Sequence, residues 1–187
     1  MKKQFILGIT LTLFSTLLFA HPGHGFLSAY AGFFHPFSGW DHLLVMIAVG
    51  AWAARIGGKA RWMLPLTFLS AMSVGTLLGY AGVYISGIET AIAASIIAMG
   101  VLLLIHLPIK LSTQAGLTML FALVHGMAHG VELTALNQVN VISGMLLATA
   151  ILHGLGFVIG LQKHKYLKKL NGAFPYVLIT VGMFAIT

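Results

Sequence analysis

The sequence predicts an all-α protein, a polytopic membrane helical bundle with six transmembrane helices after an N-terminal signal peptide. Of its 187 residues, 59% are hydrophobic and only 7% are charged, whereas a soluble domain carries about a quarter charged residues. Apolar runs of near-spanning length recur from one end of the chain to the other. This composition excludes a disordered chain and an ordinary soluble domain.

The first 20 residues have the three parts of a secretory signal peptide. Lys2 and Lys3 precede an apolar run over residues 5–19, and Ala20 stands before a polar His-Pro-Gly-His-Gly stretch. We expect cleavage after Ala20, the alternative being an uncleaved extra span. Residues 21–36 then form a periplasmic or interfacial segment, because aromatic residues recur there at helical spacing over too short a stretch to cross a bilayer.

Residues 37–187 are predicted to form one transmembrane domain with six spans. The apolar runs cover residues 37–54, 62–84, 89–105, 112–131, 140–161 and 172–187. Every Lys and Arg after the signal lies in an alternate loop, after the first, third or fifth run. The positive-inside rule makes these loops cytoplasmic and places both mature termini outside. The expected location of the protein is the inner membrane of a bacterium.

Small residues inside the spans, such as Gly75-x-x-x-Gly79 and Gly156-x-x-x-Gly160, predict a tightly packed bundle. The net charge of +7 does not indicate nucleic-acid binding, because the cations lie in short breaks between apolar runs and not along a groove with interleaved aromatics.

Metal chemistry is restricted by the absence of cysteine. Any metal must be held by histidine, carboxylate or thioether groups, and the chain has nine histidines. Its acidic residues number three, and all lie near the expected outer ends of spans: Asp41, Glu89 and Glu132. Ionisable groups in such positions are costly and mark functional sites.

The fourth span ends in the strongest candidate site. Spacings of four and three residues place His125, His129 and Glu132 on one helical stripe, where they can share a divalent cation. A glycine follows each of the two histidines and would let a neighbouring helix approach closely enough to supply further ligands. The expected donors in the same leaflet are Asp41, His42 and His35.

The donors at the start of the first span have their own spacing. Asp41 and His42 lie about one turn into the span, and His35 precedes His42 by seven residues. If the helix already runs from Pro36, His35 and His42 share a face. A lone histidine is more often a core residue, but six ligand-type groups at one depth favour a metal site.

Two further residues leave alternatives open. Glu89 stands at the start of a span, where an acid can simply cap the helix and interact with its dipole. His153 lies about 20 Å into the fifth span. It is either a stepping ligand for a passing ion or a helix–helix hydrogen bond.

Two motifs resemble the signatures of a known family. Residues 35–42, HPFSGWDH, resemble the H-P-x-x-G-x-D-H signature of the HupE/UreJ family, membrane proteins associated with hydrogenase and urease maturation. Residues 125–132, HGMAHGVE, are similar to its second signature, H-G-x-x-H-G-x-E, which usually follows Phe where this chain has Val124. The signal, the size and the six spans also fit, so the resemblance covers essentially the whole chain.

The resemblance implies inward transport of nickel, with cobalt as the other candidate, and no enzymatic activity. No prosthetic group is expected, since Ni²⁺ or Co²⁺ is the transported ion. The residues alone leave the metal open, because imidazole with carboxylate suits nickel, cobalt, zinc and copper alike. The expected partners are the metal ion and the lipid bilayer, with a cytoplasmic metallochaperone as a candidate recipient.

Two other functions remain as alternatives. One is an intramembrane zinc-dependent hydrolase, in which Asp41 or Glu132 acts as the general base that activates water. The other is a metal-binding bundle that transports nothing. The sequence does not indicate an oligomeric state.

Overall fold

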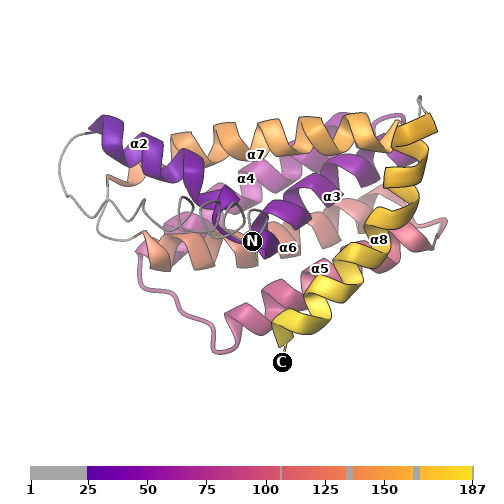
Figure 1. Ribbon diagram of the computed structural model, residues 1–187. Coiled ribbons are helices and arrows are strands. Elements are labelled where there is room, and N and C mark those ends of the chain that lie inside the picture. The colour runs from indigo at the N-terminus through magenta and orange to yellow at the C-terminus, as the bar shows by residue number, and fades with distance from the viewer. Residues whose placement is uncertain (1–24, 106, 134–136, 162–164, 187) are drawn as a thin grey trace, which may run out of the picture.

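The computed structural model describes residues 25–105, 107–133, 137–161 and 165–186. The expected signal peptide, residues 1–20, lies outside the described residues. Within the described ranges all regular structure is helical. In chain order the elements in Figure 1 are α2 (Gly25–Phe34), the 3₁₀ helix η1 (His35–Phe37), α3 (Trp40–Ile56), α4 (Ala60–Tyr80), α5 (Ile88–Leu104), α6 (Leu111–Glu132), α7 (Gln138–Gly160) and α8 (Lys165–Ile186).

The helices α3 to α8 correspond one to one with the six apolar runs. Four of them, α4, α6, α7 and α8, are long and apolar enough to cross a membrane. The pair Ser28–Phe37 and Trp40–Ile56, bent by 80°, makes a fifth candidate span. With 17 residues, α5 is about 25 Å long and shorter than the ~30 Å hydrocarbon core. The described residues therefore form a multi-pass helical bundle with four to five candidate spans, where the sequence predicted six.

Glycines bring two pairs of helices into backbone contact. Between α4 and α6, a Cβ atom added at Gly126 would lie 2.2 Å from the carbonyl oxygen of Met72. Between α3 and α7, one added at Gly50 would lie 2.0 Å from the carbonyl oxygen of His153. Such small residues let helix axes approach within a membrane, and the predicted tight packing is confirmed.

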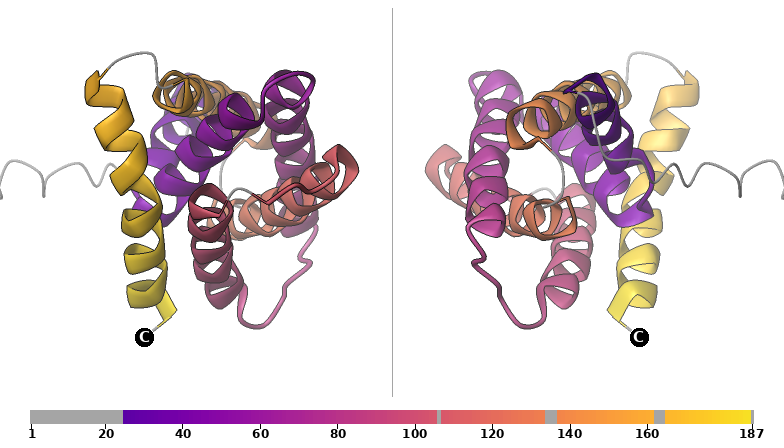
Figure 2. Two further views of the ribbon diagram at one scale, coloured as in Figure 1. Left: turned by 90° about the vertical axis from the view of Figure 1, so that its right-hand side faces the viewer. Right: turned by 90° about the vertical axis from the view of Figure 1, so that its left-hand side faces the viewer.

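The helices α5 and α8 pair with each other along the side of the group formed by α3, α4, α6 and α7 (Figure 2). Arg55 of α3 connects that group to the pair at the end opposite the start of α3. Its guanidinium donates hydrogen bonds to the carbonyl oxygen of Leu103 in α5 and to that of Asn171 in α8, the latter at 2.7 Å. These hydrogen bonds hold α5 and α8 against α3 at this end of the bundle.

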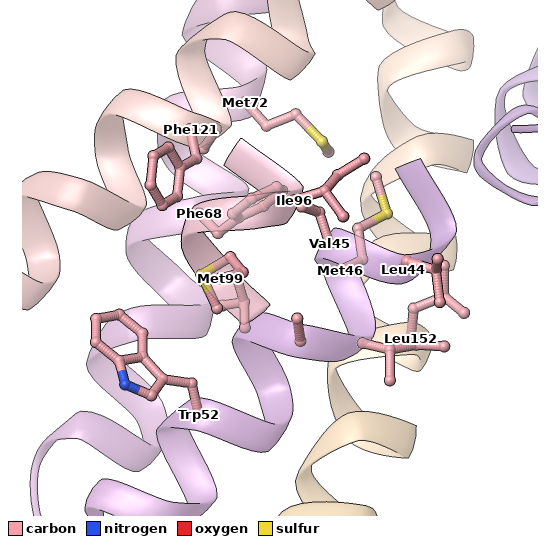
Figure 3. Close-up of a cluster of buried hydrophobic side chains, with 14 of the residues drawn as sticks. Leu44, Val45, Met46, Trp52, Phe68, Met72, Ile96, Met99, Phe121 and Leu152 are labelled. Carbon is pink, nitrogen blue, oxygen red and sulfur yellow. The ribbon is translucent and has the colours of Figure 1, made fainter. Parts of the chain in front are cut away.

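Apolar side chains from all six helices α3 to α8 fill the centre of the bundle, and part of this core is drawn in Figure 3. Met46, Phe68 and Ile96 are fully buried there, and Phe121 and Leu152 nearly so. Because Met46 follows His42 by one helical turn, this core begins directly below the polar end of α3.

Candidate metal site at the ends of α3 and α6

The break between η1 and α3 shapes one side of the site. Pro36 lies in η1, and Gly39 takes an extended conformation as the N-cap of α3. A Cβ atom at Gly39 would lie 2.4 Å from Asp41 Oδ1 and 3.1 Å from His42 Nδ1. Glycine at this position therefore makes room for the Asp41–His42 pair.

The break also changes how His35 reaches the site. The sequence suggested that one helix running from Pro36 would place His35 and His42 on a common face. Such a continuous helix is not present, because the chain is interrupted between η1 and α3. The bend nevertheless brings the two imidazoles together, with ring centroids 6.3 Å apart.

The last turns of α6 supply the other side. His125, His129 and Glu132 lie on the predicted stripe, and both histidines are fully buried. The helix that approaches at Gly126 and Gly130 is α4, through the backbone of Met72 and Thr76. The sequence predicted that the helix approaching at these glycines would supply further ligands. The imidazoles that face His125 and His129 come from η1 and α3 and not from α4.

Six of the seven predicted site residues come together. His35 Nε2 lies 2.7 Å from Glu132 Oε2, and His129 Nδ1 lies 3.8 Å from the same oxygen. His35, His129 and Glu132 each offer one ligand atom within 4.8 Å of the others, a spacing that suits a shared metal ion. The ring of His42 lies 4.4 Å from that of His129 and 5.3 Å from that of His125, measured between centroids. We call these residues the outer cluster: His35, Asp41, His42, His125, His129 and Glu132.

Four imidazole nitrogens in the outer cluster are buried without a hydrogen-bond partner. His42 Nδ1 donates to Asp41 Oδ1 at 2.8 Å, and His125 Nδ1 donates to the carbonyl oxygen of Phe121 at 2.8 Å. Each neutral ring therefore keeps a free lone pair on Nε2. Both ring nitrogens of His129 are unpartnered as well. Buried polar atoms in native proteins are nearly always satisfied, so four such nitrogens at one place make the cluster a candidate ligand-binding site.

The role of Asp41 is more specific than the sequence suggested. The sequence placed it among the donors to the ion, whereas its Oδ1 atom accepts hydrogen bonds from both the ring and the backbone N–H of His42. A carboxylate that holds the second nitrogen of a ligating imidazole fixes its tautomer and raises its basicity. In a metal site, this contact would raise the affinity of His42 for the ion.

The outer cluster opens into a cavity of about 320 Å³. The chain has three acidic residues in total, and Asp41, Glu89 and Glu132 all line this cavity. Glu89 was left open by the sequence because it stands in the first turn of α5, where helix capping explains it equally well. Glu89 does lie in that first turn, and it also lines the cavity, so it joins the candidate site while the capping interpretation stays open.

His153 lies apart from the outer cluster. Its Nδ1 donates to the carbonyl oxygen of Met46 at 2.7 Å, and its ring packs edge-on against Phe68 with centroids 5.1 Å apart. The helix–helix hydrogen bond considered from the sequence is thus present. Its Nε2 is nevertheless buried without a partner, so a ligand role stays compatible with the bond.

Comparisons with known proteins match most of the chain. The family model described as HupE / UreJ protein matches residues 9–185. A protein named Protein HupE, from Rhizobium leguminosarum bv. viciae, is 42% identical over 148 residues, which cover 79% of this chain and 76% of that protein. No solved structure matches the chain.

Proposed function

Because the chain belongs to the HupE/UreJ family, we propose that it moves a divalent transition-metal ion inward across the cytoplasmic membrane. Nickel is the first candidate and cobalt the second. The observation that carries the proposal is the group of four unpartnered imidazole nitrogens beside the carboxylates of Asp41 and Glu132. Neutral imidazole and carboxylate are the ligands that these ions accept, and carboxylate adds the charge that attracts them.

The distribution of cations supports an outer position for the cluster. Arg55 lies in the last turn of α3, Lys59 is the N-cap of α4 and Lys110 that of α6, whereas the outer cluster lies around the start of α3 and the end of α6. The two groups are therefore at opposite ends of the bundle. By the positive-inside rule the cationic end faces the cytoplasm.

The proposed topology has six spans, α3 to α8, with both mature termini outside after cleavage behind Ala20. Both α3 and α5 have 17 residues, the lower limit for a transmembrane helix. An ion released at the inner end would reach a cytoplasmic metallochaperone.

Capture begins in the open cavity, where three carboxylates face a hydrated dication. Glu132 then holds the ion beside His35 and His129, and the Nε2 atoms of His42 and His125 replace further water molecules. A membrane potential supplies the driving force, about 4.6 kcal/mol per 100 mV for a divalent cation. The site must therefore bind tightly enough to capture and loosely enough to release.

Uptake into sealed vesicles under an imposed potential tests the proposal, with Ni²⁺, Co²⁺ and Zn²⁺ supplied separately. We expect Ni²⁺ or Co²⁺ to accumulate with the wild-type protein and not with His42→Ala at equal abundance. Accumulation of none of the three ions would contradict the proposal, and so would normal accumulation with His42→Ala.

The zinc-hydrolase alternative needs a carboxylate free to activate water. Asp41 Oδ1 accepts a hydrogen bond from His42, and Glu132 Oε2 lies 2.7 Å from His35 Nε2. Because both candidate bases are engaged by imidazoles, the geometry favours ion capture.

A further inference from the structure

Two methionine sulfurs meet one buried hydroxyl in the middle of the bundle. Thr149 Oγ1 of α7 donates to Met46 Sδ of α3 at 3.3 Å and lies 3.8 Å from Met72 Sδ of α4. All three residues are completely buried. In Figure 3 the sulfur ends of Met46 and Met72 point toward one another.

The direction of the Thr149 hydroxyl differs from that of the other buried threonines in the described residues. Thr76 and Thr118 each donate to a carbonyl oxygen one turn back in their own helix, at 2.8 and 2.9 Å. This is the common way to satisfy a hydroxyl in an apolar helix. A thioether is a much weaker acceptor than a carbonyl, so the hydrogen bond by itself gives little reason for Thr149 to face two sulfurs.

Unpartnered imidazole nitrogens lie near this group on two helices: His153 Nδ1 donates to the Met46 carbonyl, and Gly126, which follows His125, packs against the Met72 carbonyl. His153 is one turn from Thr149 on α7, and His125 is in ring contact with His42 of the outer cluster at 5.3 Å. The ring of Phe68 lies 6.2 Å from that of His125 and 5.1 Å from that of His153. The Nε2 atoms of His125 and His153 are both buried without a partner. Ligand-type groups thus continue inward from the outer cluster.

We propose that Met46 Sδ, Met72 Sδ and Thr149 Oγ1 form a second, inner metal site, the thioether site, which the ion occupies between His125 and His153. The proposal rests on the proposed function and adds a sulfur-coordinated step to it. Two ligand atoms of one ion, each at about 2.0–2.3 Å, lie roughly 3–4 Å apart. The two distances from Thr149 Oγ1 fall in that range.

The chemistry of the thioether site suits passage. Thioethers accept soft and borderline transition-metal ions and not Mg²⁺ or Ca²⁺, so the site acts as a second filter behind the outer cluster. None of its three groups is charged. The ion is therefore held less firmly than beside Asp41 and Glu132, which favours release toward the cytoplasm.

X-ray absorption of the purified full-length protein loaded with two equivalents of Ni²⁺ tests the site directly. The chain contains no cysteine, so a sulfur atom bound to nickel must belong to methionine. We expect sulfur in the nickel shell of the wild type and only nitrogen and oxygen in Met46→Leu/Met72→Leu. The matched control is Met99→Leu, an equally buried methionine whose sulfur lies across the Phe68 ring from the other two in Figure 3. A wild-type nickel shell without sulfur overturns the proposal.

Uptake of Ni²⁺ into vesicles tests the role in passage. We expect Met46→Leu/Met72→Leu to lower the uptake rate at least about tenfold, with Met99→Leu at the wild-type rate. Exchange of methionine for leucine conserves volume and is well tolerated in cores. If the double variant does not fold, the single substitutions Met46→Leu and Met72→Leu decide, each lowering uptake severalfold.

The outcomes separate this site from the proposed function. Wild-type rates in the folded leucine variants overturn the thioether site while leaving outer capture and transport in place. If the wild-type protein accumulates none of Ni²⁺, Co²⁺ and Zn²⁺, the proposed function fails, and the absorption spectrum alone decides whether the thioether site binds metal.

Discussion

The outer cluster and the buried region around His153 hold their imidazoles in the same way but differ in charge. His42, His125 and His153 each donate Nδ1–H to an oxygen and leave Nε2 without a partner. The oxygen is a carboxylate at His42 and a backbone carbonyl at the other two. Every acidic residue of the chain lines the outer cavity. In the proposed transport, charge is thus concentrated where the ion would arrive with its water, and neutral ligands follow where it would have to move on.

Among substitutions that test this difference, His129→Ala is expected to have the largest effect on nickel binding and uptake. His129 is fully buried, both its ring nitrogens are unpartnered, and it lies in contact with His35 and His42. Removing it takes a shared ligand out of the outer cluster, so both equilibrium nickel binding and uptake should be lost. The control is His164→Ala, which the sequence places in a cytoplasmic loop. Normal uptake by His129→Ala at normal abundance would refute a shared outer site.

The second prediction separates passage from capture through His153→Asn. An asparagine side chain keeps a donor near the position of Nδ1 for the Met46 carbonyl but has no nitrogen at the position of Nε2. We expect nickel to bind the purified variant as it binds the wild type, while uptake into vesicles falls about tenfold or more. Full uptake by His153→Asn would mean that His153 serves only as a hydrogen-bond donor to Met46. Loss of nickel binding would mean that the capture site includes His153.

A smaller effect is expected from Asp41→Asn, which keeps the shape of the side chain and removes its charge. Loss of a carboxylate that supports a ligating imidazole lowers metal affinity by about 10- to 100-fold. Because the ligand itself remains, uptake at saturating nickel should persist. Titration with a competing chelator measures the affinity. An unchanged affinity would mean that the Asp41–His42 bond at 2.8 Å serves only to start α3.

The smallest expected effect is that of the external pH on nickel uptake. A protonated imidazole cannot ligate a metal, so capture weakens as pH falls. Protons and metal compete for the same ring nitrogens, so the apparent affinity for nickel should decrease as the solution is acidified. Uptake at limiting nickel should follow this fall, and the binding curve of His153→Asn should have the same pH dependence. A flat profile would contradict capture dominated by histidine.

Much of the fold was predictable from hydropathy alone. Each apolar run became one helix, because such a segment in lipid must satisfy its backbone internally. The main shift is at α8, which begins at Lys165 although its apolar run begins at residue 172. Hydropathy detects the buried part of a helix and not its polar first turns. The 80° bend before α3 was missed because the sequence predicted one uninterrupted span over residues 37–54.

The site was predictable as a set of residues but not as a set of contacts. The spacing of His125, His129 and Glu132 determines their common face in any α-helix. Which group meets Asp41 depends on the turn at Gly39, and the position of Glu89 depends on how α5 packs beside α3. Such contacts between separate helices carry no periodic signal. The sulfurs of Met46 and Met72 were missed for the same reason, since methionine in an apolar run reads as core.

The backbone contact between α4 and α6 limits which sequences can keep this architecture. At Gly126 any other amino acid adds at least one carbon, which would lie 2.2 Å from a carbonyl oxygen of α4. Every missense change in that codon therefore pushes the two helices apart and with them the stripe that carries His125 and His129. By contrast, the side chain of Leu147 on the surface of the bundle is 58% exposed. Its replacement by other apolar residues should have little effect. The genetic tolerance of the protein is thus expected to be lowest at residues that have no side chain at all.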